Sequence, residues 1–241
     1  MPAIDNPPSS HLSRRTFVTA ALAGAASLSG CVSVPRPVPM LVSTATPVDI
    51  MYGPLIDEGY EVPLVPIDKI DPRFLRQEVP DPTGEAPGTI VIDTSQHFLY
   101  LVGRGGRALR YGVGLGRAGF EWSGRAVVAR KAKWPKWFPP EEMIERQPEL
   151  EKYRPEYDKV SGEWRGGMEP GIMNPLGARA LYLYENGKDT LYRIHGSPEW
   201  WTIGRSVSSG CVRMINQDVI DLYDRVPIDT PVLVTSGLRV V

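Results

Sequence analysis

The chain has 241 residues, of which 42% are hydrophobic and 23% charged, and its formal net charge is −1 at pH 7. This is the composition of a globular protein with one good core, and the near-zero charge excludes a general basic surface for nucleic acid. Glycine and proline, with 24 residues each, favour turns, linkers and short strands over a helical bundle.

The first thirty residues have the pattern of an export signal. Two arginines precede an apolar run over residues 19–28, which is too short to span a bilayer. The stretch Ser13–Val18 resembles a twin-arginine signal, and residues 28–31 (LSGC) resemble a bacterial lipobox. This resemblance implies removal of residues 1–30 and attachment of lipid to Cys31. The alternative is a short hydrophobic helix packed on the domain, with Cys31 as a small buried residue.

The export signal sets expectations for location and for the cysteines. It predicts a protein of the periplasm or cell envelope that is anchored to a membrane through Cys31. Val32 stands where an inner-membrane retention signal usually has aspartate, so outer-membrane delivery is favoured in a host with two membranes. If Cys31 carries lipid, Cys211 is the only thiol left and no internal disulfide can form.

The remaining chain divides at Gly88. Residues 31–87 are rich in proline and predict an extended tether, with one short ordered segment around residues 67–79. Residues 88–241 predict a mainly β domain, either a sandwich or a barrel, with a few short helices. The expected strands are short apolar runs between turn residues, at 89–93, 98–102, 110–116, 124–132, 180–184, 191–195 and 231–235. The first two should form a hairpin.

Two segments depart from this strand pattern. Residues 133–176 form a long connection rich in tryptophan and proline, which predicts a lid or wall of a site or, equally, an insertion that covers a sheet face with aromatic rings. Residues 217–226 predict a helix capped by Asn216, with Val219, Tyr223 and Val226 on one face.

The candidate chemistry lies in a histidine and a cysteine. A thiol attacks as a thiolate, and a neighbouring imidazole can take its proton or hold the thiolate as an ion pair. His195 ends a predicted strand, and Cys211 follows a turn at residues 208–210. The backbone N–H groups of Gly210 and Cys211, with Ser209 as a third donor, can turn toward a tetrahedral oxyanion. Spacing alone leaves open that Cys211 is simply a core residue.

The surrounding motif resembles the L,D-transpeptidase catalytic domain, the YkuD-like family. The resemblance rests on His195-Gly196 followed by residues 208–213 (SSGCVR), and on the opening strands of residues 88–114. It covers about residues 88–236. It implies a mixed, mainly β sandwich that cleaves the bond between the third residue of a peptidoglycan tetrapeptide stem and its terminal D-alanine. The acyl group would pass through a thioester on Cys211 to an amine acceptor, and carbapenems would acylate the same thiol.

The motif departs from the family at one position. Many members have a second histidine two residues before the cysteine, whereas this chain has Ser209, as other members do. The reaction type stands, but imidazole assistance to the oxyanion is lost.

Weaker candidates surround the pair. Ser208 can hydrogen-bond near the thiolate or shape the turn, and Arg213 can bind a stem carboxylate or pair with an acid such as Asp218 or Asp221. Tyr111 and Trp201 can line the donor cleft or simply pack. The cysteines and histidines lack metal-ligand spacing, so neither a metal nor a cofactor is expected.

The resemblance leaves the acceptor open. Transfer to a stem peptide gives a 3-3 cross-link, transfer to a protein amine attaches that protein, and transfer to water makes the enzyme an L,D-carboxypeptidase or amidase. A non-catalytic lipoprotein that binds peptidoglycan is the alternative from another class.

Overall fold

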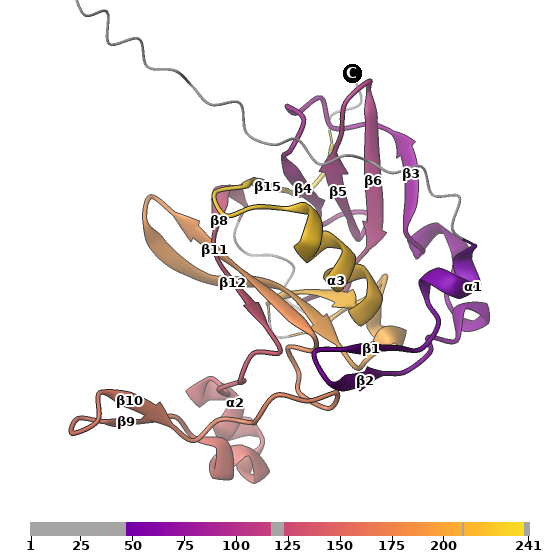
Figure 1. Cartoon of the computed structure of the whole chain (residues 1–241). Coiled ribbons are helices and arrows are strands. Elements are labelled where there is room, and N and C mark those ends of the chain that lie inside the picture. The colour runs from indigo at the N-terminus through magenta and orange to yellow at the C-terminus, as the bar shows by residue number, and fades with distance from the viewer. Residues whose placement is uncertain (1–46, 117–122, 209, 239–241) are drawn as a thin grey trace, which may run out of the picture. The chain divides into compact units, whose positions relative to one another are not determined.

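The computed structural model describes residues 47–116, 123–208 and 210–238 (Figure 1). The signal segment, Cys31 and Ser209 lie outside the described residues. No helix in the described ranges is long and apolar enough to cross a membrane.

The main sheet has nine strands, in the order β14-β12-β11-β8-β15-β4-β5-β6-β3. Its strands are β3 (Gln77–Pro80), β4 (Ile90–Asp93), β5 (Phe98–Val102), β6 (Arg107–Gly112), β8 (Gly124–Lys133), β11 (Arg179–Glu185), β12 (Lys188–Ser197), β14 (Val212–Ile215) and β15 (Pro231–Thr235). The other strands are β1 (Leu55–Asp57), β2 (Tyr60–Val62), β7 (Leu115–Gly116), β9 (Glu156–Asp158), β10 (Glu163–Arg165) and β13 (Ser206–Ser208). The helices are α1 (Val48–Met51), α2 (Glu141–Arg146) and α3 (Asn216–Arg225), with 3-10 turns at Ile67–Lys69, Pro72–Phe74, Pro148–Tyr153 and Trp200–Thr202.

The prediction of a mainly β domain is confirmed. Six of the seven expected strands are present, the one expected at 110–116 is divided between β6 and β7, and β4 and β5 form the expected antiparallel hairpin. The sequence pattern missed two strands of the main sheet. β14 is short and directly joins α3, and β3 lies in the segment expected to be a tether.

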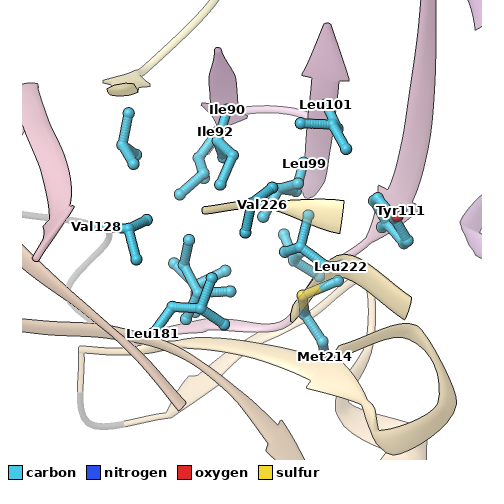
Figure 2. Close-up of a cluster of buried hydrophobic side chains, with 14 of the residues drawn as sticks. Ile90, Ile92, Leu99, Leu101, Tyr111, Val128, Leu181, Met214, Leu222 and Val226 are labelled. Carbon is cyan, nitrogen blue, oxygen red and sulfur yellow. The ribbon is translucent and has the colours of Figure 1, made fainter. Parts of the chain in front are cut away.

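One core unites both halves of the sheet with α3. Figure 2 shows Ile90 and Leu99 of the β4–β5 hairpin facing Leu181 of β11, with Leu222 of α3 in the same cluster. Because side chains alternate along a strand, one face of each of these strands contributes to this core. The face of β11 and β12 that points away from α3 is therefore available for a site.

The extended tether expected for residues 31–87 is wrong from residue 47 onward, whereas the short ordered segment expected around residues 67–79 is present as two 3-10 turns and β3. Residues 47–80 pack on the second face of β4 and β5, where Tyr52, Phe74 and Leu75 join Phe98 and Tyr100 in a second buried cluster. β3 also pairs with β6 as the edge strand of the sheet. A strand such as β5 that is apolar at every position needs cover on both faces, and this segment supplies it.

Polar contacts to α3 hold the N-terminal segment in place. The Tyr52 hydroxyl donates to the Asp218 carboxylate at 3.0 Å, and Arg76 forms an ion pair with Asp221 at 2.7 Å. The Gln217 amide donates to the carbonyl groups of Gly53 and Pro63. Burial raises the pKa of Asp218 to about 7, although Arg76 and the Tyr52 hydroxyl oppose that shift.

The helix expected at residues 217–226 is confirmed, but its cap is not. Asn216 is the first residue of α3, and its side-chain oxygen accepts the backbone N–H of Ala178 at 2.9 Å. Asn216 therefore ties the helix to the chain entering β11. Val219 and Val226 are buried and Tyr223 is partly buried, as the predicted face requires.

The long connection at 133–176 has structure of its own. It contains α2, a 3-10 turn and the β9–β10 hairpin, whose Tyr157 and Trp164 rings are exposed and 5.2 Å apart. At its start, Trp134 is buried, stacks on Tyr60 at 4.2 Å and donates to Asp57 at 2.7 Å. The first tryptophan is thus a packing residue.

Candidate active site

β12 places His195 on the face opposite the core. Its neighbour Ile194 is fully buried in the core cluster, so alternation directs the His195 side chain to the other face. His195 pairs with Ala180 of β11 and with Arg213 of β14 and is 5% exposed. Its Nδ1 lies 2.6 Å from the Gly196 carbonyl oxygen. Since a carbonyl only accepts, Nδ1 carries a proton, and Nε2 of the neutral ring is an acceptor.

Cys211 stands one residue before β14, which runs parallel to β12. The register pairs Ile194 with Val212, so Cys211 lies beside Arg193. The backbone N–H of Arg193 hydrogen-bonds the sulfur of Cys211, which is half-buried. His195 and Cys211 therefore share one face of neighbouring strands, one side-chain repeat apart, at a Cα separation of roughly 7–8 Å that side chains can bridge.

Burial sets the proton positions of both groups. It lowers the pKa of His195 to about 4, with the carbonyl groups of Gly196 and Pro175 acting against the shift. Burial also raises the pKa of the Cys211 thiol, although the Arg193 N–H and the charges of Arg193 and Arg213 favour the thiolate. At neutral pH the two groups are therefore a neutral imidazole and a thiol.

The glycines beside these groups meet specific steric demands. Gly210 has φ of +120°, a conformation that side chains disfavour, and this lets the chain turn into Cys211. A Cβ on Gly196 would lie 2.3 Å from the Asn216 side-chain oxygen and 3.0 Å from the Ala178 nitrogen. Ser208 ends β13, which pairs with β7, while Ser209 lies outside the described residues.

Arg213 has a different partner from those expected. Its guanidinium pairs with Glu199 and not with Asp218 or Asp221. Those two carboxylates contact Tyr52 and Arg76 instead. The alternation along β14 decides this, because Arg213 pairs with His195 and so points away from the helix.

The expectation that Tyr111 lines a cleft is wrong. Its ring is fully buried in the core (Figure 2). Its hydroxyl donates to Asp221 at 2.7 Å. Burial, with the Asp221 charge, raises the pKa of Tyr111 well above its ordinary value. Trp201 is half exposed and meets Trp200 edge to face at 5.6 Å, so its ring remains available to a ligand.

Sequence reasoning overlooked Arg193 and Glu199. Arg193 is two residues before His195, and the strand alternation alone could have placed it on the same face. Glu199 carried no such signal, because its pairing with Arg213 depends on the turn after β12. Within the part of the chain that the structure describes, no cluster of three or more His, Cys, Asp or Glu side chains could hold a metal ion.

Comparison with known proteins decides the family. The sequence model of the YkuD L,D-transpeptidase catalytic domain matches residues 87–234, which contain β4 to β15 and both His195 and Cys211. The chain belongs to the L,D-transpeptidase catalytic domain family. The match begins within one residue of the predicted boundary at Gly88, so residues 47–86 form an addition that packs on this family's domain.

Curated relatives carry the same family name. The chain is 33% identical over 146 residues to a probable L,D-transpeptidase ErfK/SrfK of Salmonella typhimurium, covering 59% of this chain and 42% of that protein. It is 33% identical over 149 residues to a probable L,D-transpeptidase YbiS of Escherichia coli, covering 59% and 43%. The chain thus spans less than half the length of these relatives.

A solved structure from Brucella melitensis is similar in sequence. It is 48% identical, with 67% of this chain and 94% of that chain covered and a TM-score of 0.45. That protein is described as a probable carnitine operon oxidoreductase.

Proposed function

We propose that this L,D-transpeptidase domain cleaves the tetrapeptide stem of peptidoglycan and transfers the acyl group through a thioester on Cys211. The observation that carries the proposal is the β12–β14 register, which aligns Cys211 and a buried, neutral His195 on the same sheet face. Family membership supports the reaction class.

In this mechanism His195 acts as a general base. Because the pKa of Cys211 is raised, the thiol keeps its proton at neutral pH and a base must remove it. As the sulfur attacks the carbonyl of the third stem residue, Nε2 of His195 takes the thiol proton. The backbone N–H groups of Gly210 and Cys211, with that of Ser209, stabilise the oxyanion.

Collapse of the tetrahedral intermediate breaks the bond to the terminal D-alanine. The proton held by His195 passes to the leaving amine, which leaves the acyl group on sulfur as a thioester. An acceptor amine then attacks this thioester and loses a proton to His195, and the Cys211 sulfur leaves as the thiol again. Ser208 and Gly196 support the geometry of this site, and Arg213 and Trp201 contact the substrate.

The proposed location follows from the N-terminal signal. Cys31 would carry lipid, and the mature protein would act in the cell envelope, at the outer membrane where there is one. Mass spectrometry of the mature N-terminus and membrane fractionation test this. Uncleaved protein, or soluble protein that begins well beyond Cys31, contradicts it.

Incubation of the purified full-length protein with muropeptides tests the reaction. Mass spectrometry should find dimers joined through the third stem residues, and Cys211→Ala should form none. Loss of D-alanine alone would make the protein a carboxypeptidase, and an unchanged substrate would favour a binding protein.

A carbapenem tests the nucleophile independently of the acceptor. Peptide mapping should find one adduct per chain, on Cys211. An adduct on another residue, or none on folded protein, refutes the assignment.

A further inference from the structure

The sheet face that carries His195 and Cys211 also carries a row of arginine and tyrosine side chains. α3 and the core cover the opposite face of β11 and β12 (Figure 1). The register pairs Tyr182 of β11 with Arg193 of β12 on one side and with Arg130 of β8 on the other. Since Arg193 lies beside Cys211, this row leads from the thiol across three further strands.

Both arginines stack on the tyrosine. The guanidinium carbon of Arg130 is 3.4 Å from the centroid of the Tyr182 ring, and that of Arg193 is 4.6 Å away. The arginines reach the ring from strands on both sides of β11. Stacking on an aromatic face restricts a guanidinium before any ligand arrives, which lowers the entropy that binding must remove.

The arginines on this face differ in whether they have an acidic partner. Arg193 forms two hydrogen bonds with the Asp189 carboxylate, at 2.7 and 2.9 Å, and Arg213 pairs with Glu199. Arg130 is exposed, and its side chain has no ion pair or hydrogen bond to any residue with a described position. The Tyr182 ring therefore orients the N–H donors of the Arg130 guanidinium, and these donors are accessible to a ligand. A planar guanidinium can donate two parallel hydrogen bonds to a carboxylate.

We infer that Arg130, held on the Tyr182 ring, binds a carboxylate of the acyl donor and so selects stem peptides that bear one. Tyr182 is two strands from Cys211, so the guanidinium lies roughly 10 Å from the thiol at about 4.8 Å per strand. An extended peptide covers that distance in about three residues. The carboxylate therefore belongs to a part of the donor away from the scissile bond. The inference rests on the proposed function.

Steady-state kinetics of the full-length protein test this with two tetrapeptide donors. One keeps its side carboxylates free, and the other has every carboxylate except the C-terminal one converted to an amide. Arg130→Gln should lower kcat/KM for the free donor roughly 10- to 100-fold, mainly through KM, because a charged hydrogen-bonded contact is lost. The amidated donor should lose less than about threefold, and Arg130→Lys should recover part of the selectivity.

Two controls separate this effect from misfolding and from a general charge effect. Thermal unfolding of Arg130→Gln should match that of the wild type, since the Arg130 side chain is exposed and substitutions of exposed side chains usually change stability little. Arg104→Gln removes an exposed charge from the turn between β5 and β6 and should change neither donor.

The inference is overturned if Arg130→Gln lowers kcat/KM equally for both donors or for neither. As long as the wild-type protein turns over the donors, the proposed function stands in either case. If the wild-type protein turns over neither donor, the proposed function fails and the inference falls with it.

Discussion

Arg179 and Asp57 form a buried ion pair that fastens the β1–β2 hairpin to β11. The Arg179 side chain is 2% exposed and makes two hydrogen bonds to the Asp57 carboxylate, at 2.6 and 2.8 Å. Trp134 donates to the same carboxylate at 2.7 Å. The substitution Asp57→Asn keeps the shape of the side chain and removes its charge, which leaves the arginine buried without a counter-ion.

The cost follows from the burial of the arginine. Removing one partner of a buried pair costs about 3–5 kcal/mol, because the remaining charge stays desolvated. Asp57 is 15% exposed, so water reaches the site and the lower end of that range, about 3 kcal/mol, is expected. In a domain of this size that lowers Tm by roughly 6–12 °C.

Urea and thermal unfolding of the full-length protein, followed by circular dichroism, measure this cost. The matched control is Glu58→Gln in the same hairpin, because the Lys133–Glu58 pair is 47% and 50% exposed and should contribute little to stability. A loss for Asp57→Asn no larger than that for Glu58→Gln would refute the argument from burial.

The pair also predicts a pH dependence. Burial acts to raise the pKa of Asp57, but hydrogen bonds from Arg179 and Trp134 outweigh it and the pKa is lowered. A carboxylate with a lowered folded-state pKa adds stability above its unfolded value of 3.8, and this stability is lost as the pH falls through the folded-state pKa. The difference between wild type and Asp57→Asn should therefore shrink below about pH 4.

Three further predictions concern the active site. Because burial lowers the pKa of His195 to about 4, its base form is lost only at low pH, so carbapenem acylation should stay level from pH 7 to 5.5 and fall below about pH 5; a decline centred on pH 6.5 contradicts this. Gly196→Ala should cost at least about 2 kcal/mol in unfolding experiments, because its Cβ meets the Asn216 oxygen, whereas Gly171→Ala, with nothing within 4 Å, should be close to neutral; equal losses would rule out the clash. His195→Ala should slow acylation roughly 10²–10⁴-fold, while Ser209→Ala, which keeps its backbone N–H, should slow it far less; a comparable collapse would make the Ser209 hydroxyl part of the machinery.

The sequence predicted the strands more closely than it predicted their surroundings. The runs at 98–102 and 231–235 match β5 and β15 residue for residue, because alternation and turn residues act over a few positions. Alternation and turn residues do not indicate which segment of the chain packs on a strand's face. The proline-rich segment before Gly88 had no periodicity of its own, yet from residue 47 it covers one face of β5.

The candidate site was found partly from sequence and partly from register. The motif around His195 and Cys211 was sufficient to identify the family, but motif letters do not say which way a side chain points. Burial of Tyr111 in the core and the pairing of Arg213 with Glu199 both follow from which face each strand presents. That orientation depends on pairing with strands far away in the chain.

By itself, the sequence determined the family, the mainly β class and the two residues proposed for the chemistry, because each is encoded in short local patterns. Only the tertiary structure decided what lies around them. Arg130 and Cys211 are about eighty positions apart in the chain, and the order β14-β12-β11-β8 sets them on one row of one sheet face. The order of the strands depends on how distant segments pack into one core, so it cannot be predicted from short sequence patterns.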